Sequence, residues 1–250
     1  MNGGPALEDN AVEIDAEGMH HRELNQLLKA LDKKGIKKVR IINVTGQRYI
    51  GTGLINIKEI EIFGTPGNDL GIFMNGPKII VHGDVKDGCG NTMNKGEIIV
   101  YGSAGDILGY SMRGGKIFVK NDVGYRACIH MKEYGDQRPI VVIGGTAKDF
   151  LGEYMAGGIL VLIGLGLSNG AAHNANYVGA GMHGGIMYIR GGINHISKDV
   201  VKMELEKQDR LLLQGLLNEF CKYFKEKVNE EGFYKLIPLK KRPYSQLYAY

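Results

Sequence analysis

Cysteine and proline are scarce in this chain of 250 residues, and tryptophan is absent. The three cysteines, Cys89, Cys128 and Cys221, are too few and too scattered for a disulfide framework or a clustered thiolate site. With 6 prolines and no strict three-residue glycine period, collagen-like and proline-rich disordered chains are excluded. A composition of 44% apolar and 23% charged residues is that of an ordinary soluble folded protein.

Long apolar runs and concentrated charge are missing as well. The longest apolar run, residues 159–165, is shorter than the roughly 18 residues of a membrane span. Residues 1–9 lack the basic and apolar segments of an export signal, so we expect a cytoplasmic protein without membrane association. The net charge of +4 is spread along the chain apart from the basic run 240–242, which argues against nucleic-acid binding.

Glycine, in contrast, is abundant at 38 residues, and it accompanies an internal repeat. A phrase of the form Met-x-Gly-Gly-x-Ile-x-Val recurs, in a looser form at one site, and the first four copies follow one another every 19 residues. Insertions at residues 134–139 and 167–179 lengthen two later units, and we expect these loops to form protein contacts. The phrase begins at Met74, Met93, Met112, Met131, Met155 and Met182.

A glycine turn follows the apolar run of each unit, and the complete form of this turn is Gly-x2-Gly-x3-Gly. Asn121 stands where other units begin the turn with glycine, which we interpret as tolerance of a positive φ. The turn glycines, which we expect to have a structural role, are Gly64, Gly67, Gly71, Gly83, Gly90, Gly102, Gly105, Gly109, Gly124, Gly145 and Gly152.

A 19-residue unit of short apolar runs and glycine corners cannot bury its apolar side alone, whereas stacked units can. The repeat therefore predicts an all-β fold, a parallel β-helix of about eight coils. The six methionines should form an inward core column, and Ile80, Ile99 and Phe118 are predicted to lie in further inward columns. Apolar stripes predict a capping helix near residues 24–31 and another over 206–227. The expected organisation is an N-terminal segment and capping helix (1–35), a β-helix (36–195), and a C-terminal helix with an extended tail (196–250).

No catalytic, cofactor-binding or metal-ligating residues are predicted. The histidines at positions 82, 130, 173, 183 and 195 do not share one place in the repeat, so no spacing brings three or four ligands to one point. Cys89 and Cys128 fall in adjacent columns and are best interpreted as small buried thiols. The methionine column is core filling rather than a binding groove.

The glycine turns, together with Gly46 to Gly51 (GQRYIG) and Gly152 to Gly158 (GEYMAGG), resemble the C-terminal β-helix domain of the glutamate synthase large subunit. The resemblance covers about residues 14–191 and is strongest to the stand-alone, archaeal-type version of that domain. It implies a right-handed β-helix without catalytic residues that holds two partners together. These are a glutamine amidotransferase subunit and a synthase subunit that carries FMN and iron–sulfur clusters. It implies no cofactor in this chain.

Two other functions stay open at this point. One is a similar scaffold in formylmethanofuran dehydrogenase, whose β-helical subunit has the same glycine turns. The other is an independent hydrolase or carbohydrate-acting enzyme that uses a groove of the β-helix. Association of copies of this chain with one another is also open.

Overall fold

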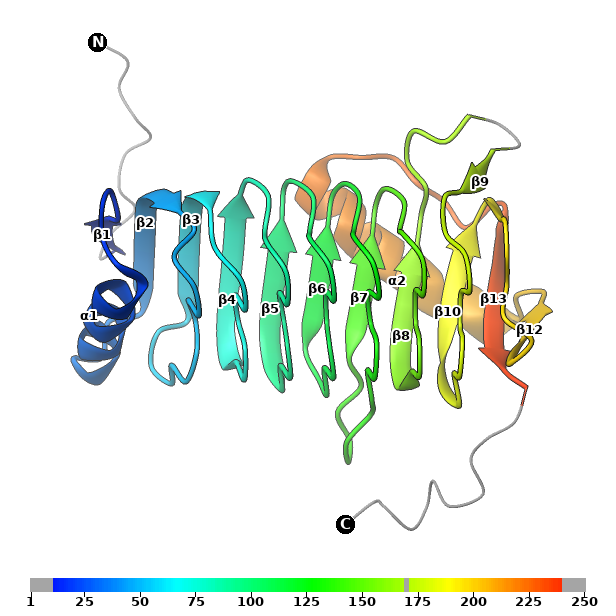
Figure 1. Ribbon diagram of the computed structural model, residues 1–250, viewed down its shortest axis with the longest axis horizontal. Coiled ribbons are helices and arrows are strands. Elements are labelled where there is room, and N and C mark those ends of the chain that lie inside the picture. The colour runs from blue at the N-terminus through cyan, green and yellow to red at the C-terminus, as the bar shows by residue number, and fades with distance from the viewer. Residues whose placement is uncertain (1–10, 169–170, 240–250) are drawn as a thin grey trace.

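The computed structural model describes residues 11–168 and 171–239, and in this part of the chain successive strands stack into a parallel solenoid of about eight turns (Figure 1). The basic run 240–242 and the segment 1–9, both considered in the sequence analysis, lie outside the described residues. The sheet begins with β1 (Ala11–Asp15), and each strand pairs in parallel with the next until β10. These strands are β2 (Lys38–Thr45), β3 (Glu59–Thr65), β4 (Asn75–His82), β5 (Lys95–Val100), β6 (Lys116–Val119), β7 (Ile140–Ile143), β8 (Ala156–Leu162) and β10 (Gly184–Arg190).

Equivalent residues of the 19-residue repeat lie directly over one another. Ile79 pairs with Ile98 in the next coil, and Ile98 pairs with Ile117 in the one after it. The six methionines that open the repeat are at most 2% exposed and lie in the core cluster inside the solenoid. The stacked parallel coils confirm the predicted fold.

One predicted set of inward residues faces the other way. Ile80, Ile99 and Phe118 pair in register, but they point outward because neighbouring residues of a strand face opposite sides of the sheet. They pack against α2 (Lys207–Phe224), through a second cluster that includes Leu217 and Phe220. The prediction for this column was wrong because both faces of the sheet are apolar here, so the sequence shows no alternation.

The N-terminal end of the solenoid is covered by α1 (His21–Lys33), as Figure 1 shows. Its start is fixed by a capping box, in which His20 and Glu23 bond each other's backbone amides. Leu24 and Leu28 are buried against the first coil. The buried carboxylate of Asp32 accepts backbone amides from the loop before β3, so the helix is tied to the coil by hydrogen bonds as well as by packing.

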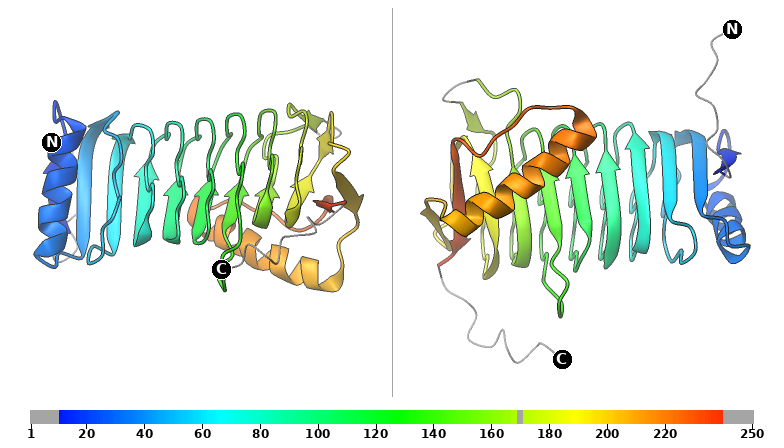
Figure 2. Two further views of the ribbon diagram at one scale, coloured as in Figure 1. Left: turned by 60° about the horizontal axis from the view of Figure 1, so that its bottom comes forward. Right: turned by 180° about the vertical axis from the view of Figure 1, so that it is seen from behind.

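The C-terminal helix is present, but it does not close the end of the stack. Figure 2 shows α2 running diagonally across the outer face of the sheet. The end is extended by β13 (Phe233–Pro238), which pairs antiparallel with β10, and by β12 (Val200–Met203), which pairs with β13. The long insertion contributes β9 (Ala172–His173), which pairs with β11 (Gly192–Ile193). Neither α1 nor α2 combines the length and the apolar character that a membrane-spanning helix needs.

Candidate functional site

Most coils contain a triplet of left-handed backbone positions that alternate with other residues. In one coil these are Ile107, Gly109 and Ser111, with φ of 51°, 64° and 51°. The amide of the middle residue donates to the preceding coil, whereas the two outer amides donate to the following one. The same triplet recurs as Tyr49, Gly51 and Gly53; Asp69, Gly71 and Phe73; Gly88, Gly90 and Thr92; Arg126, Cys128 and His130; Phe150, Gly152 and Tyr154; and Tyr177, Gly179 and Gly181. The predicted turn glycines 71, 90, 109 and 152 are thus middle residues of triplets.

The middle position faces the core and is glycine in every one of these coils except one. There Cys128 adopts a φ of 63° and is fully buried. Burial raises the pKa of the Cys89 thiol to about 12 and also raises that of Cys128, so neither thiol ionises near neutral pH. The outer residues are chemically varied, which is why counting glycines does not reveal the triplet.

The glycines that begin the predicted turns have a different role. Gly83, Gly102 and Asn121 are not left-handed, so our interpretation of Asn121 as a positive-φ substitute was wrong. A Cβ at Gly83 would lie 2.5 Å from the backbone oxygen of Gly64 in the preceding coil. Close approach of the coils, rather than the torsion angle, therefore requires glycine at Gly83.

Aspartate carboxylates lie over several of the other turn glycines, a feature that sequence reasoning missed. The carboxylate of Asp84 accepts a hydrogen bond from the backbone amide of Ser103 in the next coil at 2.7 Å, and that of Asp106 accepts one from the amide of Tyr125 at 2.8 Å. A Cβ on the glycine beside each amide, Gly102 or Gly124, would clash with the carboxylate oxygen. Gly105 and Gly145 face Asp87 and Asp122 in the same way. The signal in the sequence is an aspartate about one repeat before a glycine.

Outer triplet residues of the later coils form an exposed surface that we call the aromatic ridge: Arg126, His130, Phe150, Tyr154 and Tyr177. The His130 and Tyr154 rings stack with centroids 5.3 Å apart, and those of Phe150 and Tyr177 stack at 5.1 Å. The Arg126 guanidinium lies 4.6 Å from the Phe150 centroid and is paired with Glu153. Tyr154 and Tyr177 remain 44% and 49% exposed. Stacking therefore fixes these rings while leaving them open to contact.

The five histidines considered for metal binding occupy separate environments. His82 stacks on Phe63 and Tyr101, and His195 contacts the Tyr177 ring. His173 is fully buried, with Nε2 2.7 Å from the backbone oxygen of Arg190. His183 bonds the oxygen of Gly181, and His130 belongs to the aromatic ridge. Within residues 11–168 and 171–239, no three His, Cys, Asp or Glu side chains are grouped to hold a metal ion.

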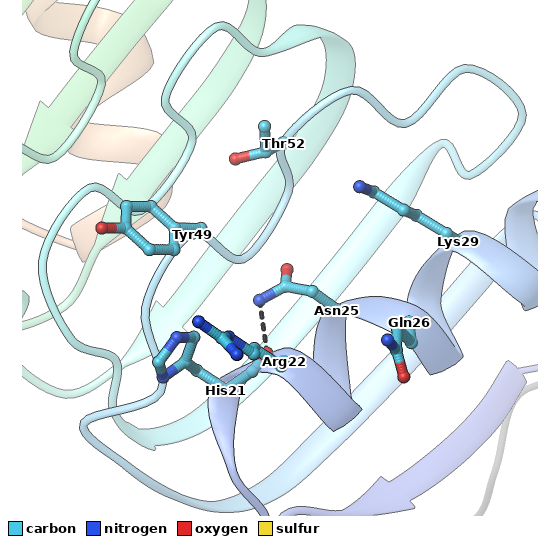
Figure 3. Close-up of a pocket in the computed structure, with 7 residues that line it drawn as sticks. All are labelled: His21, Arg22, Asn25, Gln26, Lys29, Tyr49 and Thr52. Atoms are coloured by element: carbon cyan, nitrogen blue, oxygen red, sulfur yellow. Dashed lines mark hydrogen bonds between the residues drawn. The ribbon is translucent and has the colours of Figure 1, made fainter.

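A cavity of about 460 Å³ lies between α1 and the first coil, and we call it the α1 pocket (Figure 3). Figure 3 shows Arg22, Asn25 and Lys29 projecting from the helix, with Tyr49 and Thr52 on the coil. The sequence does not predict this pocket, because the predicted helix and the Gly46 to Gly51 phrase give no indication that they lie side by side. The pocket is lined by His21, Arg22, Asn25, Gln26, Lys29, Tyr49 and Thr52.

Comparison with known proteins places this architecture in a family. A family model described as the GXGXG motif matches residues 28–236, a range that extends from within α1 to within β13. The chain is 50% identical over 255 residues to Uncharacterized protein MJ1350 of Methanocaldococcus jannaschii, covering 95% of this chain and 96% of the relative. Glycine at alternate positions is the pattern that the left-handed triplet favours.

Proposed function

Because this chain belongs to the GXGXG motif family, the family of the glutamate synthase GXGXG domain, we propose that it is a non-catalytic structural subunit of a glutamate synthase complex. The family match over residues 28–236 is the observation that carries this proposal. The solenoid supports it, because the described chain is built from hydrogen-bonded coils around an apolar core. Such a body is stiff and offers long outer faces for partners.

In the proposed complex, a glutamine amidotransferase subunit releases ammonia from glutamine. A synthase subunit with FMN and iron–sulfur clusters then uses it to convert 2-oxoglutarate into glutamate. The present chain supplies neither active site and holds the two subunits in a fixed relation. Its place is in cytoplasmic glutamate biosynthesis.

We further propose that the aromatic ridge contacts one of these subunits. Aromatic and arginine side chains are enriched at protein interfaces, where rigid rings bury much area at little entropic cost. Tyr154 and Tyr177 are suited to such a contact. They are about half exposed, so a partner can reach them, and each ring is held in place by stacking on a neighbouring coil.

The test is co-expression of the chain with the amidotransferase and synthase subunits from the same organism, followed by affinity capture and sizing. We expect one complex that contains all three chains. A Tyr154→Ala/Tyr177→Ala variant should weaken capture of one partner about tenfold or more. Leu211→Ala, which removes an apolar side chain 66% exposed on α2, is the matched control and should leave capture unchanged. A wild-type chain that captures neither subunit refutes the scaffold function, whereas unaffected capture by the double variant refutes only the ridge.

A further inference from the structure

The α1 pocket collects positive charge from two elements. Arg22 and Lys29 come from the polar face of α1, and Arg48 lies next to the pocket residue Tyr49, with its guanidinium 5.6 Å from the ring centroid. No carboxylate lines the cavity. None of these three cations forms an ion pair with any residue that the structure describes.

Several basic residues elsewhere on the solenoid are instead paired with carboxylates. Arg40 is paired with Glu61, Lys78 with Glu97, and Lys116 with Glu219. At the α1 pocket, by contrast, desolvation and the positive charges of His20, Arg22 and Arg48 lower the pKa of His21. The local field is therefore uncompensated, which favours an anion.

The pocket is also held in shape before any ligand arrives. The Asn25 amide donates to the His21 oxygen at 2.7 Å and to the Arg48 oxygen at 2.8 Å, so it joins the helix to the coil. The Tyr49 ring meets His21 edge-on at 5.9 Å and forms an aromatic wall. The hydroxyl of Thr52 is buried without a hydrogen-bond partner in the described chain, which leaves a donor at the cavity.

We propose that the α1 pocket binds a small molecule with oxyanion groups, either phosphate or carboxylate, held by Arg22 and Lys29, with Arg48 beside the pocket adding to the positive charge. Guanidinium groups bond both kinds of oxyanion in a bidentate manner, and the lysine adds a point charge. The volume of about 460 Å³ is that of a small-ligand site. Thr52 donates a further hydrogen bond to the same anion. This inference does not depend on assembly with other subunits.

In the experiment, the purified full-length chain is titrated with inorganic phosphate, pyrophosphate or citrate at constant ionic strength. Binding is measured by calorimetry and by NMR of the His21 ring. The phosphate and citrate arms distinguish the two oxyanion classes. We expect saturable binding of at least one probe, and an upward shift of the His21 titration midpoint on binding. The exposed His195, at the other end of the solenoid, reports general ionic effects and should not move.

Arg22→Gln and Lys29→Gln should each weaken binding about tenfold. Lys33→Gln removes the same charge from an exposed position of α1 outside the pocket, and should leave affinity unchanged. Thr52→Val keeps the shape and should weaken binding severalfold. Absence of saturable binding for all three probes would overturn the proposal, and such a result would favour an acidic segment of a partner as the occupant. Equal weakening by Lys33→Gln would also overturn it, since only net charge would then matter.

Discussion

The middle glycines of the left-handed triplets offer a matched pair that separates backbone strain from steric crowding. Gly71 and Gly109 occupy the same column, with φ of 70° and 64°. A Cβ at Gly71 would lie 2.7 Å from Cδ1 of the buried Ile98, whereas a Cβ at Gly109 would lie 3.4 Å from Val141. The two sites therefore share the torsional penalty and differ in the space available.

Gly109→Ala should lower the free energy of unfolding by about 1–2 kcal/mol, which is the cost of a left-handed alanine. Gly71→Ala should cost a further 1–3 kcal/mol or so, because Ile98 must move within a packed core. In a chain of this size each kcal/mol lowers Tm by about 2–4 °C, so calorimetry resolves the pair. Gly18→Ala, at φ 67° with open space around it, is the control for torsion alone and should match Gly109→Ala. Equal losses at Gly71 and Gly109 would refute the steric argument.

Three other outcomes follow from buried polar groups. Asp209→Ala removes the carboxylate that accepts a hydrogen bond from the buried Lys235 of β13 at 2.6 Å. Because the lysine would then lose this partner, the free energy of unfolding should fall by about 3–5 kcal/mol in urea titrations. Burial is the main cause of the lowered pKa of His173 in the folded chain. Below about pH 6.5, the usual pKa of histidine, this side chain is therefore protonated more readily in the unfolded chain, and protonation favours unfolding. Tm should then fall between pH 7 and 5, and less so in His173→Gln. Iodoacetamide should modify native Cys221 but not the buried Cys89 and Cys128, as mass spectrometry of the folded and unfolded chains would reveal.

Much of the fold follows from the spacing of the repeat. Identical residues 19 positions apart can share one inward column only in a stacked solenoid, and Met74, Met93 and Met112 lie there. The orientation of the strands is harder to infer. Ile98 and Ile99 are both apolar and both fully buried, one in the solenoid and one beneath α2. The alternation that distinguishes the two faces is clear only in an earlier coil, where Ile60 lies between Glu59 and Glu61 and begins the column that reaches Ile98.

The left-handed triplets and the α1 pocket were beyond sequence reasoning for different reasons. Arg126, Cys128 and His130 adopt the triplet conformation although none is glycine, because hydrogen bonds to both neighbouring coils impose it. A single residue type therefore does not mark the conformation. The α1 pocket joins a helix to a turn of the first coil, with Asn25 and Thr52 contributed from opposite sides. The sequence contains both segments as recognisable elements, the predicted helix and the Gly46 to Gly51 phrase, but nothing in either shows that they meet at a pocket.

The position of α2 bears on how such a solenoid can act as a scaffold. Each coil of a solenoid contacts only its neighbours, so bending can accumulate along the stack. Here one helix joins coils that are not neighbours. Near its start, Asp209 accepts the Tyr188 hydroxyl of β10, and near its end Tyr223 donates to Glu97 of β5, both at 2.8 Å.

Between these two points, Glu219 of α2 is paired with Lys116 of β6. Sliding or bending of the coils between β5 and β10 would break these contacts together with the apolar packing of Phe118 and Phe220. The aromatic ridge is carried by coils of this same region. A partner bound at the ridge would therefore meet a surface whose spacing is fixed along the solenoid axis, which is what the proposed scaffold function requires.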